Sequence, residues 1–251
     1  MTQLTGFLWF VLMLVPLIFL QRLLHREIQA IFLLITRSAR ITVVLFQLIF
    51  LPGVFLHELS HFLMAKLLFV RTGRFSILPR PLPSGQLQMG YVEIAQVDIL
   101  RASLIGAAPL IAGTIFVAYA AVYPLNMQSL WNALRAGQTD FFWSELVRLP
   151  QIPLFYLWFY FAFAISGMMM PSESDRHAWL ELVISVAVIF GIAVLAGGGQ
   201  WMLNNIAPLV NDLLNSVAVI FGLSAAVHTI LVLPIALVHR LLTRVMGMDI
   251  R

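Results

Sequence analysis

Long apolar runs separated by short polar segments dominate the pattern of this chain. A helix that crosses a bilayer needs about 20 mostly apolar residues, and about six stretches meet or approach this length. The pattern therefore predicts an all-α membrane protein, a polytopic bundle of about six transmembrane helices. The predicted spans are 4–24, 41–70, 99–125, 151–170, 178–196 and 206–242.

The polar segments predict how these spans are connected. Residues 22–40 carry four arginines around an apolar patch, which indicates an interfacial or short connecting helix, or a shallow membrane hairpin. Residues 71–98, which follow the second span, are rich in proline and glycine, and their imperfect alternation predicts a loop with one or two short strands, or a hairpin at the membrane surface. Residues 126–150 read as an amphipathic surface segment.

Several local signals refine the spans. Pro52-Gly53 predicts a kink or an unwound turn in the second span, and Pro234 predicts a kink in the last one. Small residues in 99–125 predict a central, closely packed helix. The first run lacks a basic leading segment and a cleavage site, so it reads as a retained helix. Without internal repeats or linkers, residues 1–251 form a single integral membrane domain.

The composition agrees with a membrane location. Of 251 residues, 61% are hydrophobic and 10% are charged, whereas a soluble domain carries about 25% charged residues. The net charge of +4 comes mainly from arginines near the ends of apolar runs, where they reach lipid headgroups. No basic stripe is interleaved with aromatic residues, so we expect the lipid bilayer and no nucleic acid as a partner. Because the chain has no cysteine, any metal site must use His, Asp or Glu.

One pentapeptide, His57-Glu58-Leu59-Ser60-His61, carries the clearest chemical signal. On a helix, residues four apart lie on one side, so both imidazoles can bind a single metal ion. Glu58 is then close enough to accept a proton from a metal-bound water. Two histidines can also simply form hydrogen bonds within a bundle, but ionisable groups in an apolar run cost at least several kcal/mol without partners. We therefore predict Zn²⁺, which favours imidazole and carboxylate ligands.

A catalytic zinc usually has three protein ligands. If residues 41–70 end at one membrane face, the crossings at 99–125 and 151–170 return the polar segment 171–177 to that face. Asp175 follows a helix-ending proline, and a broken helix end can reach into a wet cavity. We predict Asp175 as the third ligand. Its competitors are Glu173 and His177 in the same segment, followed by Asp212 and His228 in the last span.

The motif within residues 56–65 resembles that of the site-2 protease family of intramembrane zinc metalloproteases. The motif helix, the Pro/Gly-rich loop, the small-residue helix and the helix ending near Asp175 follow the family order over about residues 41–180, a metalloprotease-like core. Met-Pro-Ser-Glu-Ser-Asp at 170–175 stands where the family carries Leu-Asp-Gly.

The resemblance implies hydrolysis of peptide bonds in or near the transmembrane segments of membrane-protein substrates, most simply single-pass helices. Zn²⁺ would be held by His57, His61 and Asp175, Glu58 would be the catalytic base, and the loop at 71–98 would offer an edge strand to the substrate. The alternative is a non-proteolytic metal-binding scaffold or chaperone on the same fold. A metal transporter would need a polar route through several spans, whereas the ionisable groups concentrate at one site.

The distribution of arginines gives an orientation. One membrane face is expected to carry the arginines within 71–101, Arg176 and the C-terminal arginines, and their positive charge favours a cytoplasmic location for that face. The arginine cluster at 22–40 favours the opposite orientation. We expect a multi-pass protein with a cytoplasmic N-terminus and an active site near the cytoplasmic face.

Overall fold

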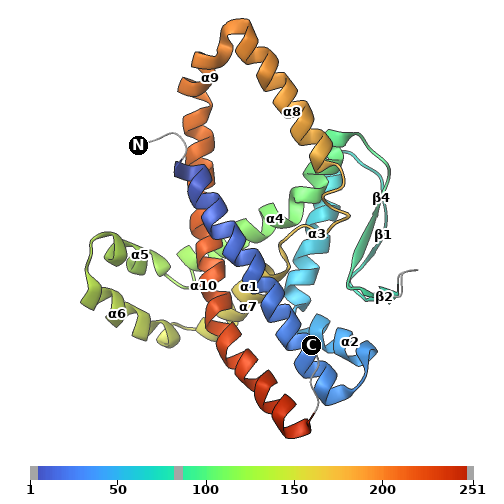
Figure 1. Ribbon diagram of the computed structural model, residues 1–251, viewed down its shortest axis with the longest axis vertical. Helices are drawn as coiled ribbons and strands as arrows, with labels where there is room; N and C mark the ends of the chain where they lie inside the picture. The colour runs from blue at the N-terminus through green and yellow to red at the C-terminus, as the bar shows by residue number, and fades with distance from the viewer. Residues whose placement is uncertain (1–4, 82–86, 248–251) are drawn as a thin grey trace.

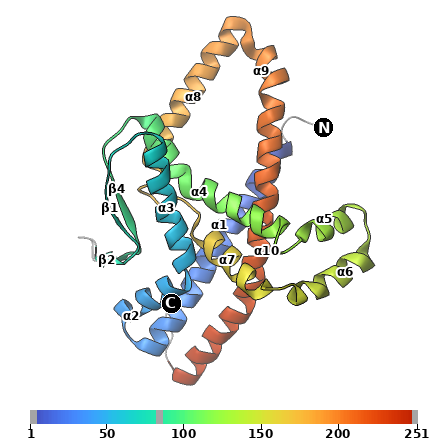
Figure 2. The same cartoon turned by 180° about the vertical axis from the view of Figure 1, so that it is seen from behind.

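Two long helices form the axis of the molecule. The structure, a computed structural model, describes residues 5–81 and 87–247. Helices α1 (Thr5–Thr36) and α10 (Ala207–Met246) run side by side in the same direction (Figures 1 and 2). Near their starts, the backbone N–H of Gly6 donates to the Asn211 side chain at 2.7 Å. Further along, His239 Nδ1 and Glu27 Oε2 lie 2.5 Å apart.

The prediction of a separate connecting segment at 22–40 is wrong. Helix α1 continues through Arg22 to Thr36 because its polar residues have partners on distant helices. Gln21 donates to the Ser166 carbonyl, and Glu27 pairs with His239. The helix ends where Arg37 adopts a φ of 52°, and Ser38 caps the next helix, α2 (Ala39–Ile49), by accepting from the Ile41 N–H at 3.5 Å.

The predicted break in the second span is confirmed. Helices α2 and α3 (Leu51–Leu67) meet at Phe50 with a bend of 77°. Pro52 lies in the first turn of α3, where its missing N–H leaves no hydrogen bond unmade. Gly53 lets α3 approach α7 (Phe155–Met168), because a side chain there would overlap the Ala164 carbonyl oxygen.

The region after α3 contains four short strands in its described part: β1 (Thr72–Ser76), β2 (Arg80–Pro81), β3 (Leu87–Gln88) and β4 (Tyr91–Ile94). Strands β3 and β4 coincide with the predicted alternation, but they do not pair with each other. Instead β4 pairs antiparallel with β1, and β3 pairs antiparallel with β2. The predicted loop positions Pro83 and Gly85 lie outside the described residues.

The middle of the chain agrees with its predicted character. Helix α4 (Ile99–Val122) buries the small residues Gly106, Ala108 and Gly113, which confirms a closely packed helix. The segment predicted to be amphipathic forms α5 (Met127–Arg135) and α6 (Thr139–Arg148), two short helices that project from the side of the molecule (Figure 1). The turn η1 (Leu149–Gln151) leads into α7.

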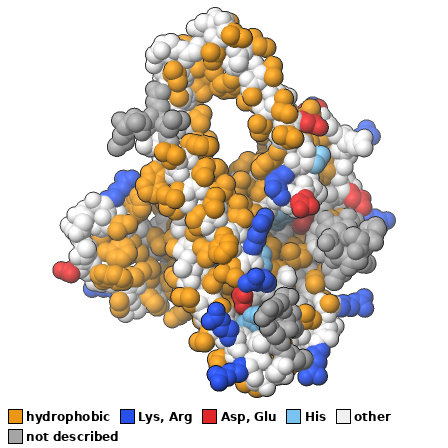
Figure 3. All heavy atoms as spheres, in the orientation of Figure 1, with side chains coloured by type: hydrophobic (Ala, Val, Ile, Leu, Met, Phe, Trp, Pro, Cys, Tyr) orange, Lys and Arg blue, Asp and Glu red, His pale blue; other side chains and the backbone are white. Residues whose placement is uncertain are grey.

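The predicted span at 151–170 needs correction, whereas the predicted span at 178–196 falls within Trp179–Asn205, which is long and apolar enough to cross a membrane. Helix α7 has only 14 residues, and it reaches membrane length only together with residues 139–151, across a 97° bend. Helix α8 (Trp179–Ala193), a π-helical turn (Val194–Gly198) and α9 (Gly199–Asn205) form an arch. The chain reverses at Gly197, whose φ of 88° favours glycine. Figure 3 shows an opening beneath this arch.

The helices indicate a multi-pass membrane protein. Within the described residues, four helices are long and apolar enough to cross a membrane, or up to six if each of the two bent pairs forms one span. Large apolar side chains cover most of the face seen in Figure 3. Pro234 lies inside α10, as expected from the sequence.

Candidate metal centre

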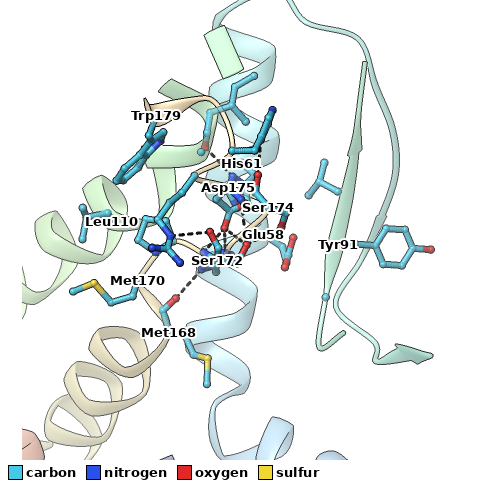
Figure 4. A pocket seen from close by; sticks show the side chains of 18 of the residues that line it. Glu58, His61, Tyr91, Leu110, Met168, Met170, Ser172, Ser174, Asp175 and Trp179 are labelled. Carbon is cyan, nitrogen blue, oxygen red and sulfur yellow. Dashed lines mark hydrogen bonds and ion pairs between the residues drawn. The ribbon is translucent and has the colours of Figure 1, made fainter. Parts of the chain in front are cut away.

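The structure brings His57, His61 and Asp175 together. The histidines lie one turn apart on α3, and Asp175 lies on the turn between α7 and α8 (Figure 4). Asp175 Oδ2 is 3.5 Å from His57 Nε2, and Oδ1 is 3.3 Å from His61 Nε2. One possible ligand atom from each residue lies within 4.8 Å of the other two.

Backbone carbonyls fix the orientation of both imidazole rings. His57 Nδ1 lies 2.7 Å from the Met168 carbonyl oxygen, and His61 Nδ1 lies 2.8 Å from that of Ile105. Since a carbonyl oxygen can only accept, each Nδ1 carries the hydrogen and donates it. When a ring is neutral, its Nε2 has a lone pair that can bind a cation, and when the ring is protonated, its Nε2–H donates to Asp175 instead.

A proline makes the Ile105 carbonyl available. In a regular helix, that carbonyl would accept the N–H of the residue four positions later. Position 109 in α4 is a buried proline, which has no N–H. The Ile105 oxygen is thus left for His61 Nδ1, and sequence reasoning did not identify the contribution of Pro109 to this contact.

The end of α7 supplies the second carbonyl. Met168 is the last residue of α7, and the N–H four positions later belongs to Ser172. That N–H donates to Asp175 Oδ2 at 2.7 Å instead of continuing the helix. The Met168 carbonyl is therefore free of its usual partner and accepts from His57.

Asp175 is held by a reciprocal capping arrangement. The Ser172 hydroxyl donates to Asp175 Oδ2 at 2.6 Å, and the Asp175 N–H lies 3.3 Å from the Ser172 hydroxyl oxygen. Together with the Ser172 N–H this forms a capping box, and the sequence Ser-x-x-Asp at 172–175 was a signal for it.

The same contacts keep Asp175 ionised. Burial raises the pKa of the Asp175 carboxyl, but its hydrogen bonds with His57, His61 and Ser172 and the charge of His61 outweigh this effect. The pKa of Asp175 is thereby held well below its usual range. Asp175 therefore presents an anionic oxygen to the two imidazoles.

Two glycines allow close approach to the centre. A side chain at Gly106 of α4 would overlap the carbonyl oxygen of Asp175. A Cβ at Gly90, between β3 and β4, would lie 2.7 Å from Glu58 Cγ and 2.9 Å from Glu58 Oε1. The buried Glu58 side chain thus packs directly against the backbone of the strand region.

A cavity of about 1400 Å³ opens onto these residues. Its wall comes from α1, α3, α4, the strand region and the turn that carries Asp175. Glu58, His57, His61 and Asp175 all line it. Water and a peptide segment can therefore reach the centre.

The competing ligand candidates are not part of this group, although His177 also lines the cavity. Glu173 is exposed, and the exposed His177 has Nδ1 2.6 Å from the Ser174 carbonyl oxygen. Asp212 is exposed on α10. His228 is fully buried, with Nδ1 2.8 Å from the Ser224 carbonyl oxygen. None of the four belongs to the three-residue group in the described part of the chain.

The three donors suit zinc. Ligand distances of about 2.0–2.1 Å in a tetrahedral site place neighbouring donor atoms about 3.3–3.4 Å apart. The Nε2–oxygen distances of 3.5 and 3.3 Å, which run to the two different oxygens of Asp175, are close to that spacing, and one donor atom from each residue lies within 4.8 Å of the others. Two imidazole nitrogens and one carboxylate also leave the fourth position for water or substrate. Comparison with protein-family models, curated proteins and solved structures gives no match for this chain.

Proposed function

We propose that this protein is an intramembrane zinc metalloprotease that hydrolyses peptide bonds in or near transmembrane segments of membrane proteins. One observation carries the proposal: two imidazole Nε2 atoms and a carboxylate converge beside a buried glutamate. Neutral imidazoles and a carboxylate so close together need a cation between them, either a proton or a metal ion, and the group has the composition to hold a metal. His57, His61 and Asp175 would hold zinc, the metal to which this donor set is suited.

Glu58 is the proposed catalytic base. When bound, zinc would supply Lewis acidity toward the scissile carbonyl and lower the pKa of a coordinated water. Glu58 accepts the proton of the attacking water, the water oxygen bonds to the carbonyl carbon, and the C–N bond breaks. The same proton then passes from Glu58 to the leaving amine, so that one carboxylic acid and one amine are formed.

The wall of the cavity suggests how a substrate is held. Strand β4 contributes Tyr91, Val92 and Ile94 to the cavity, and within the described residues it pairs only with β1. An unwound segment of a single-pass substrate could add to its second edge as a further strand. Such a segment would pass Glu58, which packs against Gly90 at the start of β4.

Orientation remains part of the proposal. The arginine distribution favours a cytoplasmic N-terminus and a centre that opens near the cytoplasmic face. Labelling of single introduced cysteines from either side of sealed vesicles tests this, since the chain has no cysteine of its own.

The test of the activity uses two variants of the full chain in nanodiscs. Glu58→Gln should keep zinc and lose cleavage of a labelled single-pass substrate, because it removes the base and spares the ligands. His57→Ala should lose both zinc and cleavage. Zinc is measured by elemental analysis and cleavage by gel mobility of the product.

Each departure from this pattern has a definite meaning. Full cleavage by Glu58→Gln would remove the base assignment. Zinc bound at full occupancy, with no cleavage of any transmembrane substrate by the unmodified protein, would instead support the scaffold or chaperone function.

A further inference from the structure

One face of α1 lines the cavity, and the two halves of this face differ in their chemistry. Phe10, Leu14, Ile18 and Arg22 recur every four residues and all line the cavity. This spacing places them in one stripe along the helix. The stripe is apolar for about three turns and then becomes cationic.

Arg22 has no partner that explains its position. An arginine within an apolar helix is expensive in a membrane and marks a functional site unless it is paired. The Arg22 side chain is exposed to the cavity and forms no hydrogen bond or ion pair with any other residue that the structure describes. One turn further, Arg26 is bound to Glu27 at 3.1 Å and does not line the cavity. The two arginines are therefore not equivalent.

A second guanidinium reaches the same cavity from the turn after α7. Arg176 Nε donates to the Ser172 carbonyl at 3.2 Å, and this bond leaves its terminal nitrogens available. Among the residues that the structure describes, the acids that line the cavity are Glu58 and Asp175, which belong to the proposed metal centre. An anionic ligand that enters the cavity would meet two arginines and no acid outside that centre. Figure 3 shows several Lys and Arg side chains in a broken line near the middle of the face, with Asp, Glu and His side chains among them.

We propose that Arg22, assisted by Arg176, is a specificity-determining residue that binds a carboxylate of the substrate. The occupant that fits the stripe is an apolar helix followed by an acidic side chain. Its apolar part lies along Phe10, Leu14 and Ile18, and its carboxylate forms a charge-assisted, bidentate pair with Arg22. This inference rests on the proposed function for the identity of the ligand as a substrate.

Binding is measured separately from cleavage. The parent protein is the full chain with Glu58→Gln, in nanodiscs of phosphatidylcholine. Two labelled peptides share one apolar helix and end in Asp-Asp or Asn-Asn. We expect the Asp peptide to bind about tenfold more tightly, equivalent to one charge-assisted pair. Adding Arg22→Gln should reduce that ratio to less than about twofold, while the matched control Arg26→Gln should leave it unchanged.

A charge-reversal variant distinguishes loss of the binding residue from misfolding of the protein. Arg22→Glu should prefer a Lys-Lys peptide over the Asp-Asp peptide, a gain that an unfolded protein cannot show. Equal binding of the Asp and Asn peptides by the parent, or an equal effect of Arg26→Gln, overturns the inference. A phosphate of a lipid headgroup could occupy the same guanidinium. Loss of the Asp preference in nanodiscs that contain phosphatidylglycerol would assign Arg22 to lipid and also overturn it.

The two proposals fail differently. With Glu58 intact, absence of cleavage together with a preserved Asp preference would reject the protease and retain the carboxylate subsite. Cleavage of both peptides at equal rates, with no difference in binding, would retain the protease and reject the subsite.

Discussion

The lone pairs at the centre are aimed by atoms that are not ligands. Each histidine is fixed by a backbone carbonyl on another helix, Met168 on α7 and Ile105 on α4. Such partners of ligating histidines typically change metal affinity about 10–100-fold when they are lost. Asp175 is likewise fixed by Ser172, so each of the three donors has a defined direction before any metal binds.

Asp175→Asn tests the third ligand directly. The amide keeps the size of the side chain but loses the negative charge that balances a divalent cation. We expect the zinc content after dialysis to fall well below that of the unmodified protein, with the helical circular dichroism unchanged. Unchanged zinc by elemental analysis would move the ligand to another residue.

Gly106→Ala tests the approach of α4 to the Asp175 turn. The added methyl group would overlap the Asp175 carbonyl oxygen, so the turn must shift and carry the carboxylate with it. We expect weaker zinc binding, measured by competition with a chelating dye. Gly191→Ala on α8 is the matched control, because no atom lies within 4 Å of its Cβ position. Equal zinc affinity in both variants would show that the turn tolerates the displacement.

At the scale of secondary-structure elements, interruptions in helices create the site. The break at Phe50 sets the direction of α3, Pro109 frees a carbonyl within α4, and the end of α7 frees another. Regular helices would have used these carbonyls internally. The geometry of the site is therefore set at the positions where regular helical hydrogen bonding stops.

Pro109→Ala restores an N–H that competes with His61 for the Ile105 carbonyl. Alanine also favours the helix by about 3 kcal/mol relative to proline in an exposed helix interior. We therefore expect equal or greater resistance to unfolding by SDS, together with weaker zinc binding. Pro234→Ala in α10, away from the cavity, should also resist unfolding by SDS equally or better, but its zinc affinity should not change. Unchanged zinc affinity in Pro109→Ala would mean that His61 does not depend on this carbonyl.

Local patterns predicted the features that depend on near neighbours. The spacing of His57 and His61 fixes their common face, and the topology of two crossings led to Asp175, which the structure places beside them. The break near Pro52 and the close packing around Gly106 follow from proline and glycine chemistry in the same way.

The errors concern residues whose partners are distant in the sequence. The charges of α1 resembled an interfacial segment because Glu27 pairs with His239, 212 positions away. The pairing of β4 with β1 was not predicted either, because a short alternation contains no information about the partner strand. A different error concerns α7, whose length was overestimated mainly at its start, because apolar residues precede the point where Leu154 adopts a φ of 60° and the helix begins.

At the scale of the whole molecule, α1 is both a wall of the cavity and a partner of α10. Its contacts with α10 extend from Gly6 to Glu27, and they include the aromatic pair Phe10–Phe221 with ring centroids 5.6 Å apart. The proposed metal centre is carried by α3, α4 and the turn after α7 instead. Changes in the α1–α10 contact should therefore affect substrate binding in the cavity and the free energy of unfolding more than they affect zinc binding.

Glu27→Gln tests this separation. The carboxylate of Glu27 lies 2.5 Å from His239 Nδ1, and their side chains are only 10% and 15% exposed. Replacing the charged acceptor by a neutral amide should lower the free energy of unfolding by about 2 kcal/mol, as for other hydrogen bonds to charged groups. Arg26→Gln removes only an exposed partner and should change it by less than about 1 kcal/mol. SDS titration followed by tryptophan fluorescence measures both. Because α1 would be held less firmly, we also expect a higher KM for a transmembrane substrate at unchanged zinc content. Loss of zinc in Glu27→Gln would show instead that metal binding depends on the contact between α1 and α10.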